Sequence, residues 1–140
     1  MLENIKILIK GNDVCVLSAV SKDVVPHSSF MAYITGENRR EIYMATHSTS
    51  KKYKNMQKNP AVTLLIDYRE IKPRQKAHTL TISGVFQPIN DEHKRSRIES
   101  LLIKQHNHLK DFINDPAKVS AALRRLNFPV SSKRWGCRYC

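Results

Sequence analysis

Cysteine is scarce in this sequence, with three among 140 residues. An odd, small number argues against a disulfide framework and agrees with a reducing compartment. Cys15 stands in an apolar run and is expected to be a core thiol. Cys137 and Cys140 form a C-x-x-C pair, which suits a redox couple or half of a zinc site. Zinc needs two more ligands, and the other close pair is His106 with His108, so no metal site is predicted.

Long apolar stretches are also missing. No segment approaches the roughly 18 apolar residues that cross a membrane. The first ten residues carry only a short apolar run with no basic stretch before it, unlike a signal peptide. We therefore expect a cytoplasmic protein with no membrane partner. The length, with 41% hydrophobic and 26% charged residues, predicts one globular domain spanning residues 1–140.

Acidic residues are few. Twelve Asp and Glu stand against 24 Lys and Arg, giving a formal net charge of +12. Such an excess indicates an anionic partner, which could be nucleic acid, a membrane surface or a phosphorylated small molecule. Composition alone does not choose among the three.

Apolar runs and turn signals predict a mainly β protein. Five strands are expected, over residues 14–20, 24–35, 41–46, 61–68 and 78–89. Helices are expected over residues 2–10, 49–58 and 91–104, with a loop over 69–77. Most connections between strands are too short for helical crossovers, which disfavours a parallel sheet. The predicted fold class is α+β, an antiparallel barrel with helices packed outside it.

Several single residues refine this prediction. Pro26 places the start of its strand at a sheet edge, and Gly84 is a candidate bulge. Asp115 and Pro116 suit the first residues of a helix. The apolar residues from Val119 onward fit either that helix or a last strand, and residues 120–140 could also be a loose tail.

The junction between the third strand and the next helix carries the clearest chemistry. Hydroxyl residues Thr46, Thr49 and Ser50 precede Lys51 and Lys52 in the first helical turn. Free backbone N–H groups and the positive dipole end make a helix start favourable for an anion. Lysines there oppose the dipole, so an anion would offset them. The alternative is an ordinary serine N-cap followed by a solvated lysine face.

The order of these residues resembles the pyridoxamine-phosphate-oxidase-like flavin-binding split barrels. Thr46, Ser50-Lys51-Lys52 and Asn59-Pro60 follow a strand that contains tyrosine. The likeness extends upstream through residues 14–20 and 26–34 and downstream through 62–67, 80–89 and 101–104, covering roughly residues 3–115. It implies an antiparallel split β-barrel that forms a homodimer and holds flavin mononucleotide (FMN) at the subunit interface.

The resemblance also implies roles for individual residues. Lys51 and Lys52 would bind the flavin phosphate with the hydroxyls of Thr46 and Ser50. Residues 28–32 would follow the isoalloxazine ring, largely through backbone groups. The implied cofactor-binding residues are Ser28, Ser29, Phe30, Met31, Ala32, Ala45, Thr46, Thr49, Ser50, Lys51 and Lys52.

The sequence departs from the oxidase itself. Ser29 stands where the oxidase has Arg, and Ile34 stands where it has a substrate-side Lys. The oxidase's Trp- and Arg-containing substrate region is not recognisable in residues 133–136. The resemblance therefore implies a flavin reductase-like oxidoreductase with a small-molecule redox substrate rather than vitamin B6 oxidation. It assigns no catalytic residue, although His27 and His47 lie near the expected site.

Other functions remain open on sequence grounds. Some relatives hold deazaflavin or haem in the same place, and His47 or His78 could serve as a haem ligand. The protein could also bind flavin without catalysis. A basic nucleic-acid-binding barrel is disfavoured, because aromatic residues do not alternate with Lys and Arg along the predicted strands.

Overall fold

The computed structural model describes residues 13–36, 41–67 and 79–125. The helix expected over residues 2–10, the loop over 69–77 and the C-x-x-C pair lie outside the described residues.

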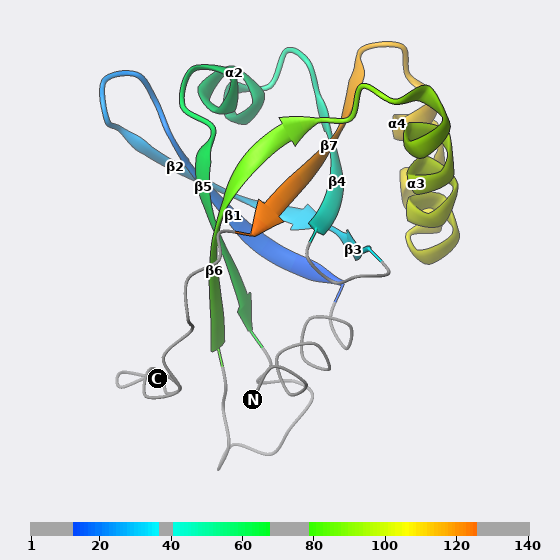
Figure 1. The fold of residues 1–140 in the computed structure, drawn as a ribbon, viewed down its shortest axis with the longest axis horizontal. Coiled ribbons are helices and arrows are strands. Elements are labelled where there is room, and N and C mark those ends of the chain that lie inside the picture. The colour runs from blue at the N-terminus through cyan, green and yellow to red at the C-terminus, as the bar shows by residue number, and fades with distance from the viewer. Residues whose placement is uncertain (1–12, 37–40, 68–78, 126–140) are drawn as a thin grey trace.

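The described residues form one curled antiparallel sheet with helices around it (Figure 1). Its strands are β1 (Val14–Val20), β2 (Pro26–Ala32), β3 (Ile34–Thr35), β4 (Glu41–His47), β5 (Ala61–Asp67), β6 (Thr79–Pro88) and β7 (Lys118–Arg125). The helices are α2 (Lys51–Lys58), α3 (Glu92–Gln105) and α4 (Lys110–Asn114), with a short 3-10 helix η2 (Asn107–Leu109) before α4. The strand order is β2-β1-β5-β6-β7-β4-β3, and every neighbouring pair is antiparallel.

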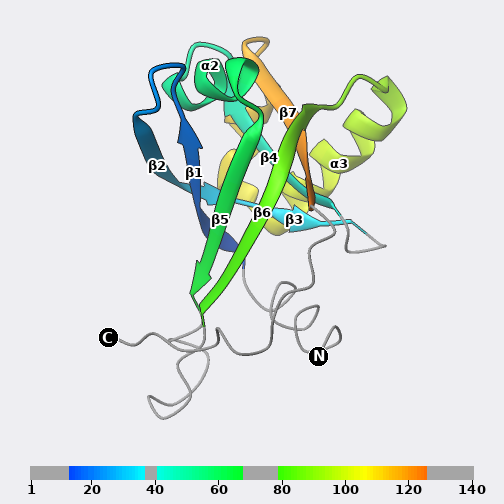
Figure 2. The same ribbon diagram turned by 60° about the vertical axis from the view of Figure 1, so that its left-hand side comes forward.

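The sheet closes on itself at Tyr33. Strands β2 and β3 lie at opposite ends of the strand order, yet only Tyr33 separates them in the chain. The sheet must therefore curl until its two edges meet, as Figure 2 shows from the side. The Tyr33 N–H donates to the carbonyl of Asp13 at 3.0 Å. Its own carbonyl lies 2.9 Å from Nε2 of the buried His106, and because a carbonyl only accepts, this imidazole nitrogen must donate.

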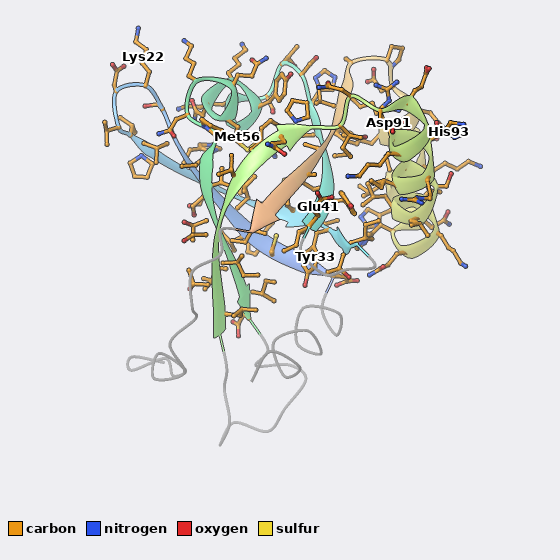
Figure 3. All side chains as sticks on the ribbon, viewed as in Figure 1. Lys22, Tyr33, Glu41, Met56, Asp91 and His93 are labelled. Atoms are coloured by element: carbon orange, nitrogen blue, oxygen red, sulfur yellow. The ribbon has the colours of Figure 1, made fainter. Side chains whose placement is uncertain are left out.

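Inward-facing residues of the curled sheet make the main hydrophobic core. Alternate strand residues point inside, among them Leu17, Leu64 and Ile82. Helix α2 covers one end of this core with Met56, which Figure 3 labels, and with the partly buried Tyr53. Cys15 belongs to the same core as expected, and burial raises the pKa of its thiol to about 12. This cysteine is therefore a protonated packing residue at neutral pH.

A second core lies outside the barrel, between its wall and helices α3 and α4. Tyr43 on the outer face of β4 packs there with Ile98 and Leu102 of α3 and Ile113 of α4. The prediction of helices packed outside an antiparallel split barrel is confirmed. Within the described residues, no helix has the length and apolar character needed to cross a membrane.

Two ion pairs fix α3 to the barrel wall. The Lys94 Nζ lies 2.9 Å from the Glu41 carboxylate, which also accepts from the Tyr43 hydroxyl at 2.6 Å. The Lys118 Nζ lies 3.0 Å from Glu99. These carboxylates are largely buried, so their partners offset the cost of removing them from water.

Three local predictions need correction. The second strand is not continuous over residues 24–35, because it begins at Pro26 and breaks at Tyr33. Asp115 follows α4 instead of starting a helix, and the chain then forms β7 because Lys118–Arg125 fills the space between β6 and β4. Gly84 is not a bulge, since it pairs in register with Val62 and also with Arg125. The edge position of Pro26 was predicted correctly.

We predict that Val24→Gly stabilises the protein. Val24 lies in the tight β1–β2 connection, 77% exposed, with a φ of 63°. The left-handed region crowds a β-branched side chain and costs on the order of 1–3 kcal/mol. Removing the side chain should gain about 1 kcal/mol, which raises the Tm by about 3 °C in thermal unfolding.

The matched control is Val25→Gly at the neighbouring exposed position, which has no positive φ. It should lower stability, because glycine adds unfolded-state entropy without relieving strain. A loss of stability in Val24→Gly equal to that of the control would contradict the prediction.

Candidate functional site

A hydroxyl cluster occupies the turn between β4 and α2. Ser50 has extended backbone geometry and is the N-cap of α2, accepting a hydrogen bond from the Tyr53 N–H at 3.3 Å. Its Oγ also lies 3.1 Å from the Oγ1 of Thr46, which is only 3% exposed. If Thr46 donates to Ser50, the Ser50 hydroxyl hydrogen stays available to an anion at the helix start. The Ser50 cap explains locally why α2 begins at Lys51.

The first turn of α2 is basic and carries no acidic residue. Lys51 is exposed, whereas Lys52 is partly buried, and desolvation lowers the pKa of its amine. Both positive charges stand at the positive end of the helix dipole, which is unfavourable without a counter-charge. A bound dianion would relieve both effects, since it would favour the charged form of Lys52.

Four contacts involve His47 and Ser48, two of them within the turn and two to the segment that follows α4. Nδ1 of His47 lies 2.7 Å from the Thr49 Oγ1 and accepts the Thr49 N–H at 3.3 Å. Nε2 of the same ring lies 3.6 Å from the Asp115 carboxylate. The Ser48 N–H donates to the carbonyl of Ala117 at 2.8 Å. The turn is therefore anchored to the segment between α4 and β7.

Two strand edges without ladder partners lead away from this turn. In the described part of the chain, β2 pairs only with β1, and β3 covers β4 only at Ile42 and Tyr43. Edge strands present unpaired backbone N–H and C=O groups. Continuing the β3–β4 register past Tyr33 would set Ala32 opposite Ala45 and Met31 opposite Thr46. Residues 28–32 and residues 45–46, which the resemblance implied as cofactor-binding, thus lie along the facing edges of β2 and β4.

Side chains of β2 point alternately out of and into the barrel. Ser28 and Phe30 face outward, and Phe30 is 80% exposed. Met31 is buried in the core, and Ser29 is half-buried. The buried Oγ of Ser29 and Nδ1 of His27 have no hydrogen-bond partner among the described residues. Two buried side-chain atoms of β2 therefore lack hydrogen-bond partners within the described residues, which is unusual for buried polar groups.

The structure thus brings the predicted residues together in two sets, except for Ala45, which packs against the second core. Residues 46 and 49–52 converge at the start of α2, and residues 28–32 form the open edge of β2. Sequence reasoning missed Asp115, whose carboxylate reaches His47 from far along the chain. It also missed Asn55 of α2, whose buried Nδ2 lacks a partner among the described residues. No local pattern signals the Asp115 contact or the burial of Asn55, because both depend on tertiary packing.

The family follows from comparison with known sequences. The family model of pyridoxamine 5'-phosphate oxidase matches residues 1–126, most of the chain. The chain therefore belongs to the pyridoxamine 5'-phosphate oxidase family, as the resemblance implied. No curated protein matches it.

Solved structures share the fold at low sequence identity. HutZ, the haem storage protein of Vibrio cholerae, superposes with a TM-score of 0.76 at 12% identity, covering 90% of each chain. A candidate pyridoxamine 5'-phosphate oxidase from Listeria innocua gives a TM-score of 0.71 at 23% identity, covering 88% of this chain and 91% of that one. An FAD-binding protein from Mesorhizobium loti gives 0.70 at 16% identity, covering 89% and 87%. The fold therefore occurs with flavin and with haem.

We predict that Ser50→Ala destabilises the protein by about 1 kcal/mol, because the Tyr53 N–H loses its cap. Urea unfolding followed by circular dichroism measures the change. Ser48→Ala is the control, since Ser48 precedes the cap, and it should change stability by less than about 0.5 kcal/mol. Equal losses in the two variants would contradict the capping role.

Proposed function

We propose that this protein binds FMN, with the phosphate at the start of α2 and the ring along the open edges of β2 and β4. The observation that supports this most directly is the meeting of two unpaired strand edges at a basic, hydroxyl-rich helix start. Family membership makes a flavin the first ligand to consider. A flavin mononucleotide matches the arrangement because it joins one terminal phosphate to a planar ring with polar edges.

The phosphate would be held by Ser50, Lys51, Lys52 and the free backbone N–H groups of the first turn. The buried Thr46 would orient the Ser50 hydroxyl, to which it is hydrogen bonded. The ring would receive hydrogen bonds from backbone groups of residues 28–32. Bound FMN would supply the redox chemistry, while the chain supplies anchoring, orientation and the electrostatics around the ring.

The contacts of His47 make it poorly suited to hold a haem iron. A haem iron needs an axial ligand, commonly a histidine nitrogen. His47 is the histidine beside the α2 turn, and both of its ring nitrogens face other groups, Thr49 on one side and Asp115 on the other. His78, the other candidate from the sequence, lies outside the described residues.

We further propose that a second copy of the chain completes the flavin site. Phe30 lies opposite Val16 on β1, and Val16 lies opposite Leu65 on β5. This row, with Val14 beside it, forms an apolar patch on the outer face of the sheet, next to the edge of β2. Large exposed apolar side chains gathered on one face are typical of protein interfaces. A homodimer through this patch would place partner residues beside the ring.

The proposed activity is that of an FMN-dependent oxidoreductase acting on a small molecule. Ile34 is buried in the second core with Ile98 and Leu102, so its side chain is not available to a substrate. Ser29 provides a hydroxyl where the oxidase has a guanidinium. The change at Ile34 removes a positive charge from the substrate side, and the change at Ser29 removes one from the cofactor side. Both differences support a substrate other than pyridoxamine phosphate and a flavin reductase-like activity.

We predict that Lys51→Ala/Lys52→Ala weakens FMN binding about 50-fold, since the pair contributes roughly 2–3 kcal/mol through charged hydrogen bonds. Quenching of flavin fluorescence measures the dissociation constant. Riboflavin, which lacks the phosphate, should bind both proteins equally. Lys54→Ala/Lys58→Ala removes the same charge from later turns of α2 and should change FMN affinity less than about threefold. An unchanged dissociation constant in Lys51→Ala/Lys52→Ala would refute the phosphate assignment.

We predict that Phe30→Asp converts a dimer into a monomer. Facing a second copy, the new carboxylate would be desolvated without a partner, which costs several kcal/mol. Light scattering at about micromolar concentration measures the mass. Val24→Asp, at an equally exposed position in the β1–β2 connection, is the control and should remain dimeric. A wild-type monomer, or a dimer that survives Phe30→Asp, would exclude this interface.

A further inference from the structure

His47 makes a set of contacts that anion binding at α2 does not itself require. It lies at the end of β4, on the outer face of the barrel, with the Phe112 ring of α4 at 6.4 Å between centroids. Its Nδ1 faces the Thr49 hydroxyl at 2.7 Å and the Thr49 N–H at 3.3 Å. Its Nε2 faces Asp115 at 3.6 Å. One imidazole therefore connects a carboxylate to the hydroxyl next to the N-cap.

The protonation state of this ring decides which way the Thr49 hydroxyl points. With Nδ1 unprotonated, the ring accepts from both the Thr49 N–H and the Thr49 O–H, so neither donor is free. With Nδ1 protonated, the ring donates to the Thr49 oxygen. The Thr49 hydroxyl hydrogen is then free to turn toward an anion at the start of α2.

Asp115 restricts the choice to these two states. A neutral ring with its proton on Nδ1 would turn the Nε2 lone pair toward the carboxylate, which is repulsive. The other charged groups near the ring either have partners of their own or stand at the start of α2. Lys118, opposite His47 on β7, directs its amine to Glu99 and to the carbonyl of Ile113. Lys51 and Lys52 stand at the start of α2.

We propose that His47 is a positioning residue that sets the direction of the Thr49 hydroxyl and so the pH dependence of phosphate binding at α2. This inference rests on the proposed FMN site. Histidine is the side chain whose charge ordinarily changes between about pH 5 and 8. Protonation of the ring turns the Thr49 hydroxyl hydrogen away from Nδ1 and makes it available to the phosphate, which tightens phosphate binding. Asp115 supports the charged ring as its counter-ion.

The test compares FMN dissociation constants of the wild type and His47→Asn between pH 5.5 and pH 8. The asparagine amide places an acceptor near the former Nδ1 position but does not titrate. The phosphate has its own ionisation near pH 6, and loss of that charge weakens binding as the pH falls. Because both proteins bind the same ligand, the ratio of their constants cancels that effect. We expect the wild type to gain about tenfold over the variant from pH 8 to pH 5.5, the low end for a hydrogen bond to a charged group.

Two further variants distinguish the effect of the Thr49 hydroxyl's direction from the effect of the positive charge on His47. In a Thr49→Val background the same ratio should change less than about threefold, since no hydroxyl remains to be turned. Asp115→Asn should lower the ratio at pH 5.5, because the neutral amide gives the protonated ring no counter-ion. A ratio that is flat with pH, or that rises equally without the Thr49 hydroxyl, overturns the role of His47.

Riboflavin distinguishes this failure from failure of the proposed function. FMN that binds no tighter than riboflavin at any pH would overturn the phosphate site and the role of His47 together. FMN that binds tighter than riboflavin, with a flat ratio between the wild type and His47→Asn, would overturn the role of His47 alone.

Discussion

The passage of the chain through Tyr33 is the constraint on which the rest of this structure depends. One residue carries the backbone from the β2 edge of the sheet to the β3 edge, so the two edges must meet. Both backbone groups of this buried corner are hydrogen bonded, to Asp13 and to His106. Because β3 has only two residues, the seam closes for a short distance and then opens. The open part of the seam is where we place the flavin.

The outer helices and the site share one strand. On β4, Met44 points into the barrel core while Tyr43 points outward to α3 and α4. The same alternation places Thr46 on the inner side, beside Ser50, and His47 on the outer side, beside Asp115. Packing of the outer helices therefore reaches the α2 turn through His47. This geometry connects Asp115, which follows α4, with the turn that precedes α2.

Sequence patterns succeeded where the signal is local. The Ser50 cap, the Asp91 cap of α3 and the strands β1 and β5 follow from neighbouring residues alone. They left alternatives open, or failed, where the partner is distant. Residues 118–125 have spacing that suits a helix or a last strand, and the strand β7 forms because the edges of β6 and β4 need a strand between them. The break at Tyr33 has no local signal either, since it arises from closure of the sheet.

The net charge of +12 indicates an anionic partner without a place for it, and the two lysines after Ser50 mark the place that we propose. By itself the sequence determined the family, the antiparallel strands and the basic, hydroxyl-rich start of α2, because each depends on residues near one another in the chain. Only the tertiary structure decided that β2 and β4 present open facing edges, that Phe30 leads an exposed apolar row, and that Asp115 reaches His47. These depend on contacts between residues far apart in sequence, which become neighbours only when the sheet closes.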